Sequence, residues 1–231
     1  MNEMINFTLN ETVNSVTITT EVKGVKKIKE VSLSDFIDTL LQSTNHQKLN
    51  TFDIKKEWFF IEEKRFGLKM IHRVQLSENS FLYVIAKEKS FMPMKLAKEF
   101  HVGIPNLIFI IKVVNNRFSC MFVRACKEFG YNAPMFAYPF SNVSTSNGRV
   151  CIGSNNLSEY NFDNNPKAAF SILKMFFSMP NNMDAYSKRN NSKGLAYGEM
   201  LDYLNNKEFD DSLLVESQET YESWLNKIIR C

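Results

Sequence analysis

The chain has 231 residues, of which 44% are hydrophobic and 23% charged, a balance typical of one globular domain or of one domain with an appendage. Its net charge of +3 is too small for the strongly basic face that nucleic-acid binding needs, so we expect no nucleic-acid partner. No run approaches the roughly 18 apolar residues of a membrane helix, and the N-terminus lacks the features of a secretory signal, so we expect a cytoplasmic protein with no membrane partner.

The first 50 residues predict a small β-β-α extension. Alternating and β-branched residues indicate two strands, at residues 13–19 and 25–31, with a Lys23-Gly24 turn between them. Ser32 is placed to cap a short helix that ends near Gln42, with Asp35 three positions on in a capping-box-like arrangement.

Residues 51–180 are expected to form the core, and the first half of this region is rich in strands. Apolar and aromatic runs predict strands at residues 58–61, 68–74, 81–86, 107–114 and 117–125. Asn115-Asn116, between the last two, predicts a hairpin turn. Residues 93–100 instead predict a short helix, with Pro93 near its first position.

From residue 127 to 165 the periodicity disappears, and glycine and proline interrupt the segment. Loops of this length inside a compact domain are uncommon and often functional. Pro166 then opens an apolar helix that ends near Ser178. Residues 181–231 predict a polar loop followed by two helices, at about 195–205 and 220–230.

Four cysteines occur, at positions 120, 126, 151 and 231, and no two are spaced as CxxC. Because the three histidines are also far apart in sequence, we expect no metal site and no cofactor. Cys120 and Cys126 lie in or beside a predicted strand and are interpreted as buried apolar residues. Cys151 differs, because it follows a turn within the long loop and stands two residues before Gly153.

That context suits a nucleophile. The thiolate is the attacking species, and a free cysteine with a pKa of about 8.5 is a few per cent ionised at neutral pH. This fraction suffices for thioester exchange, in which the attacking and leaving groups are both thiols. A cysteine hydrolase would need a histidine, His72 or His101, beside the sulfur of Cys151. The alternative is that Cys151 is a small buried residue.

The segment around Cys151 resembles a known active site. Pro139, Asn142-Val143, Gly148 through Cys151 and Gly153 resemble the prokaryotic ubiquitin-conjugating-like family called PRTRC system protein B. More distantly, the segment resembles the eukaryotic ubiquitin-conjugating enzymes. The resemblance is strongest over residues 105–155.

The eukaryotic enzymes carry His-Pro-Asn, a turn with Asn-Gly, and an Ile-Cys-Leu ending. Here Phe140-Ser141-Asn142, Asn147-Gly148 and Val150-Cys151-Ile152 stand in those places. The His and Pro are therefore absent, and Asn142 lies nine residues before Cys151, one more than in the eukaryotic pattern.

The resemblance implies an α+β fold: an antiparallel sheet, a long active-site loop carrying Cys151, and flanking helices. It also implies that a ThiF-like activating enzyme, using ATP, loads a ubiquitin-like protein onto Cys151 as a thioester. The thioester then passes to an amine or a thiol, and a JAB-type deconjugating peptidase is a further expected partner. The alternative is a non-catalytic interaction module of the same fold, in which Cys151→Ala leaves function intact.

Four other residues are candidates for this site. The resemblance implies that Asn142 orients the loop or stabilises an oxyanion, the alternative being a turn asparagine that bonds its own backbone. Gly148 is expected to supply a positive φ angle. Glu159 and Asp163 are candidates for helping to deprotonate an attacking lysine, the alternative being loop solubility or a helix cap.

Overall fold

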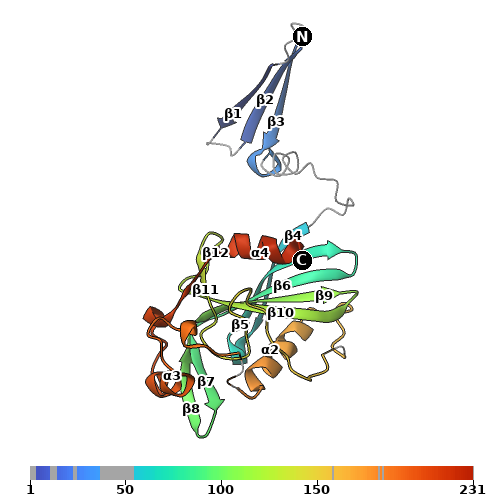
Figure 1. The fold of residues 1–231 in the computed structure, drawn as a ribbon. Helices are drawn as coiled ribbons and strands as arrows, with labels where there is room; N and C mark the ends of the chain where they lie inside the picture. The colour runs from blue at the N-terminus through green and yellow to red at the C-terminus, as the bar shows by residue number, and fades with distance from the viewer. Residues whose placement is uncertain are drawn as a thin grey trace. The chain divides into compact units, whose positions relative to one another are not determined.

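The structure is a computed structural model that describes residues 4–10, 15–22, 25–36, 55–157, 159–181, 183 and 185–230. Contacts within the chain divide it into two compact units, Met1–Thr51 and Phe52–Cys231. Figure 1 shows the described elements of both units.

The first unit holds a three-stranded antiparallel sheet in the order β1-β2-β3. Its strands are β1 (Met4–Asn10), β2 (Ser15–Val22) and β3 (Val25–Ser32). The sequence predicted two strands before the helix, and the structure has three. The additional strand is β1, a short segment of alternating apolar residues that pairs with β2 along its whole length. Residues 33–36 are helical, and the Asp35 N–H donates to Ser32 Oγ (3.0 Å), as expected of a cap. The Lys23-Gly24 turn and the rest of the predicted helix lie outside the described residues.

The second unit is built on a seven-stranded antiparallel sheet, in the order β12-β11-β10-β9-β6-β5-β4 (Figure 1). In chain order, its strands are β4 (Lys55–Glu63), β5 (Leu68–Ser77), β6 (Ser80–Lys87), β9 (Asn106–Val114), β10 (Arg117–Cys126), β11 (Pro134–Phe136) and β12 (Glu216–Thr220). The predicted α+β class with an antiparallel sheet is confirmed. Asn115 and Asn116, with φ angles of 51° and 58°, form the left-handed turn between β9 and β10.

Residues 90–104 correct one prediction. The helix predicted over residues 93–100 is wrong, because β7 (Ser90–Lys95) and β8 (Glu99–Ile104) form a separate two-stranded sheet. Burial alternates along β7, where Met92 and Met94 are buried and Pro93 is exposed, which is the period of a strand. Proline is compatible with such an edge strand.

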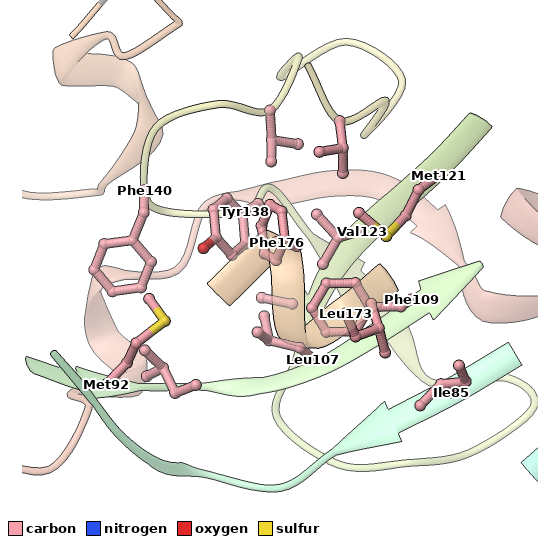
Figure 2. Close-up of a cluster of buried hydrophobic side chains, with 14 of the residues drawn as sticks. Ile85, Met92, Leu107, Phe109, Met121, Val123, Tyr138, Phe140, Leu173 and Phe176 are labelled. Carbon is pink, nitrogen blue, oxygen red and sulfur yellow. The ribbon is translucent and has the colours of Figure 1, made fainter. Parts of the chain in front are cut away.

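Helices cover both faces of the seven-stranded sheet (Figure 1). Alternate residues of β9 enter two different cores: Phe109 packs with Leu173 and Phe176 of α2 (Ala168–Ser178), whereas Ile108 packs with Trp224 of α4 (Tyr221–Arg230). Figure 2 shows the α2 core. The predicted helices after Pro166 and near the C-terminus are therefore present, and β12 is an unpredicted strand.

The remaining elements are short. Helix α3 (Tyr197–Leu204) packs against β8, and an isolated bridge joins Val102 to Asn205. The described residues also include the 3-10 helices η1 (Lys64–Phe66), η2 (Lys188–Asn190) and η3 (Asp211–Leu213). Among the described residues, no helix combines the length and apolar character needed to cross a membrane.

Candidate active site

Cys151 is exposed, and its thiol takes part in no disulfide. It directly follows a tight hairpin whose two sides meet at an isolated antiparallel bridge between Val143 and Val150. The Cys151 N–H donates to the Asn142 carbonyl oxygen (2.8 Å) and extends that pairing by one residue. The backbone of the candidate nucleophile is thus held in place, while the residue itself stays open to solvent.

The residues just before Cys151 are attached to the edge of β10. The Val123 N–H donates to the Gly148 carbonyl (2.8 Å), and the Val150 N–H donates to the Met121 carbonyl (2.9 Å). Strand β11 pairs with β10 at a single position and leaves the rest of that edge to other partners. Because backbone groups at a strand edge need hydrogen-bond partners, the loop takes the place of a neighbouring strand here.

Gly148 adopts the positive φ angle expected from the sequence, 75°. A β-carbon at this position would lie 2.7 Å from the Val123 carbonyl oxygen, closer than van der Waals contact allows. Its N–H donates to the Ser144 carbonyl (2.9 Å), and this closes the turn formed by residues 144–148, called here the 144–148 turn. Glycine is required at this position both for its backbone angle and for its lack of a side chain.

Asn142 also has a positive φ angle, 66°, which asparagine tolerates better than most residues. It is nearly buried, and its side-chain Nδ2 donates to the Pro180 carbonyl (3.0 Å) just after α2 ends. The asparagine bonds α2's C-terminal extension rather than its own backbone. An amide carries two N–H donors, and this bond uses one of them.

A small polar network holds the backbone beside Asn142. Ser141 is 1% exposed, and its Oγ lies 3.3 Å from the hydroxyl of Tyr197 in α3 and 3.2 Å from Asn181 Oδ1. Asn190, which is fully buried, donates to the Phe140 carbonyl (3.4 Å). The loop is therefore anchored to α3 and to the segment after α2 through residues 140–142.

The two candidate carboxylates, Glu159 and Asp163, are exposed. The chain just before Asp163 forms a bridge to Arg117 at the start of β10, whereas the chain before Cys151 bonds to β10 at Met121, four residues further on. At about 3.3 Å per residue, these attachment points are about 13 Å apart. Asn142 and Gly148 thus lie in the hairpin that carries Cys151, whereas Asp163 follows a segment attached elsewhere on β10.

Both histidines considered for a hydrolase have partners elsewhere. His72 is buried in β5, three strand positions from β10 or about 14 Å away, and its Nδ1 lies 3.2 Å from the Tyr221 hydroxyl. Burial lowers the pKa of His72, and nearby Lys56 lowers it further. The ring of His101 stacks on Phe91 at 4.8 Å between centroids. Within the described part of the chain, no group of three or more His, Cys, Asp or Glu side chains could hold a metal ion.

The structure adds three residues to the site that the sequence did not single out. Arg124 donates to the Thr145 and Ser146 carbonyls, Trp224 of α4 donates to the Asn147 carbonyl, and Glu219 of β12 pairs with Arg124. One local signal was available: Arg124 is a charged residue within the apolar run of β10.

The sequence model of the family described as prokaryotic E2 family D matches residues 68–217. The matched region begins with β5 and reaches the start of β12, so it contains Cys151 and the sheet that supports it. No curated protein and no solved structure gives a significant match.

Proposed function

Because the chain belongs to prokaryotic E2 family D, we propose that it is a ubiquitin-conjugating-like carrier. Cys151 accepts a ubiquitin-like protein as a thioester from an activating enzyme and passes it to an amine or a thiol. The presentation of Cys151 carries this proposal: an exposed thiol follows a hairpin that is fixed to Asn142 and to β10. A nucleophile that meets two large partners in turn needs both exposure and a constant backbone.

The proposed step exchanges one thioester for another. The Cys151 thiolate attacks the C-terminal carbonyl carbon of the ubiquitin-like protein, and the thiolate of the activating enzyme leaves. The leaving thiolate takes up a proton in place of the one that Cys151 lost, so the exchange is nearly balanced in free energy. It requires no histidine beside the sulfur, which agrees with the separate partners of His72 and His101.

Asn142 is assigned a positioning role in this proposal. Its carbonyl accepts the Cys151 N–H, and its amide ties the same backbone to Pro180. The second amide N–H is the candidate donor to the oxyanion that forms during transfer.

The proposed partners are a ubiquitin-like protein, a ThiF-like activating enzyme that uses ATP, and a JAB-type peptidase that reverses conjugation. Their support is family membership together with the likeness of residues 139–153 to PRTRC system protein B. That closer relationship is part of the proposal.

The test is a loading assay with the activating enzyme, its ubiquitin-like protein and ATP, followed by a non-reducing gel. Wild type and the control Cys231→Ser should show a thiol-sensitive band shift, because Cys231 lies outside the matched region. Cys151→Ala should show none, and Cys151→Ser should show none or a thiol-resistant ester. If wild type is not loaded while the partner demonstrably adenylates its carrier, the conjugating role fails for that pair.

A further inference from the structure

Arg124 is a buried charge without an obvious structural need. Its side chain is 1% exposed, and its neighbours on the same face of β10, Phe122 and Cys126, belong to the apolar core beneath α4. Burying a guanidinium costs several kcal/mol unless it is paired and hydrogen-bonded. The burial lowers the pKa of the Arg124 guanidinium, and Glu219 opposes this effect. The hydrogen-bond partners of the Arg124 guanidinium therefore indicate its role.

Those contacts are with the 144–148 turn. Nη1 donates to the Thr145 carbonyl (2.9 Å), and Nη2 donates to the Ser146 carbonyl (3.0 Å) and to Glu219 Oε2 (3.2 Å). The planar guanidinium fork suits two successive carbonyls, which a lysine ammonium cannot match. The Nε atom is buried without a hydrogen-bond partner. The guanidinium is therefore oriented so that its two terminal nitrogens bond to the turn and to Glu219, while the Nε donor stays unpaired.

The C-terminal segment is linked to the same turn once directly, through Trp224, and once indirectly, through the Glu219–Arg124 pair. Glu219 of β12 pairs with Arg124, and its other oxygen accepts from Lys227 of α4 (2.6 Å). Trp224, buried in α4, donates from Nε1 to the Asn147 carbonyl (3.4 Å). Three consecutive carbonyls of the turn, at residues 145–147, are thus held from the α4 face of the sheet.

We propose that Arg124 and Glu219 are a positioning pair for Cys151, through which the β12–α4 segment fixes the orientation of the loop that carries the thiol. This inference rests on the proposed carrier function. Without the pair, the 144–148 turn pivots about the Val143–Val150 bridge, and the thiol loses its fixed direction of approach. Reactions between bound groups are sensitive to such displacements, and a shift of about 1 Å can cost about 100-fold in rate.

Arg124→Lys tests the pair, Trp224→Phe tests the separate contact that α4 makes with the turn, and one matched control accompanies them. Arg124→Lys keeps the charge but cannot span both carbonyls and Glu219, and Trp224→Phe keeps the packed ring while removing its N–H donor. Lys227→Met is the control: Lys227 also pairs with Glu219, but it is 67% exposed and touches no part of the turn. Exposed ion pairs contribute little to stability.

The first measurement is amide hydrogen exchange on the full chain. In Arg124→Lys, exchange at residues 144–151 should be at least about tenfold faster, with strands β5 and β6 unchanged, because local opening is governed by local contacts. Trp224→Phe should show a smaller local increase, and Lys227→Met none. A merely structural arginine would raise exchange throughout the unit, and that result, like unchanged exchange at the turn, would overturn the inference. If Arg124→Lys does not fold, Glu219→Gln, which changes the other member of the pair, decides in the same way.

The second measurement is the rate of loading from the charged activating enzyme at saturation. Arg124→Lys should lower kcat about tenfold and leave KM unchanged, because the pair contacts the loop and not the partner. A loosened turn with an unchanged kcat would refute the positioning role. Failure of wild type to load would instead refute the proposed function, and the exchange data would still decide whether Arg124 holds the turn.

Discussion

Replacing Gly148 by alanine tests the architecture of the loop directly. The substitution adds one methyl group at a position with φ 75°, 2.7 Å from the Val123 carbonyl oxygen. The chain offers two controls that share the backbone angle but not the crowding: Gly153 (φ 58°) and Gly194 (φ 65°), where a β-carbon would meet nothing within 4 Å. The comparison separates backbone strain from steric overlap.

The magnitudes follow from these contacts. A left-handed backbone costs alanine about 1 kcal/mol relative to glycine, so Gly153→Ala and Gly194→Ala should each lose about that much stability. At Gly148 the overlap is with backbone, which cannot rotate away, so the loop must move from β10. That movement sacrifices the Gly148–Val123 and Val150–Met121 hydrogen bonds, at about 1 kcal/mol each. Gly148→Ala should therefore cost about 3 kcal/mol.

Urea denaturation of the three variants measures these differences, and iodoacetamide labelling of Cys151 follows the loop itself. Gly148→Ala should also change the rate at which iodoacetamide labels Cys151. Gly194→Ala should leave that rate unchanged, because Gly194 lies after η2 and outside the loop. If Gly148→Ala costs no more than the two controls, within about 0.5 kcal/mol, then the loop is not held against β10 in the way described.

Three further predictions concern other residues. Asn142→Gly keeps the left-handed backbone and loses only the bond to Pro180. In urea denaturation it should therefore destabilise the protein by about 1 kcal/mol less than Asn142→Ala. Equal losses of stability in the two variants would contradict the role given to the backbone angle. In native protein at about pH 8, iodoacetamide should label Cys151 and spare Cys126, because burial raises the pKa of Cys126 to about 12; labelled Cys126 in a mass spectrum would refute its burial. Burial lowers the pKa of His72 below the ordinary 6.5, so near and below that pH the unfolded chain binds a proton there that the folded chain does not, and stability should fall as the pH is lowered through 6.5. This loss of stability is measured as a fall in melting temperature, and His72→Gln should reduce it. A pH profile of His72→Gln identical to that of wild type would count against the argument.

Local pattern predicted most of the sheet. Strands β5, β6, β9 and β10 have apolar residues on both faces, and the Asn115-Asn116 turn identified their hairpin, because asparagine tolerates the left-handed angles that a two-residue turn needs. The helix predicted over residues 93–100 is wrong because a proline near the start of a mixed segment is typical both of a helix and of an edge strand. The alternation of Met92 and Met94 with exposed neighbours distinguishes the two in the structure.

The site was predictable in the parts that are local in sequence. Gly148 and Cys151 lie three residues apart, and their turn and loop context is visible without any fold. The Arg124–Glu219 pair is not local in sequence. The two residues are separated by 95 positions and meet only when β12 joins the sheet beside β11. No periodicity or motif can indicate such a pair, although a charged residue in a buried strand shows that some partner must exist.

Residues 140–142 stand where the eukaryotic motif has His-Pro-Asn, and the contacts of Phe140 and Ser141 show what replaces the missing His and Pro. Phe140 is fully buried and packs edge-on to Tyr138 and Phe209, within the core shown in Figure 2. Ser141 is buried as well and belongs to the network with Tyr197. Packing and hydrogen bonding on the inner side of the loop account for Phe140 and Ser141. Of the three residues, Asn142 is the one that bonds to the backbone of Cys151. Residues 140 and 141 thus anchor the loop from within, and this anchoring requires neither the His nor the Pro of the eukaryotic motif.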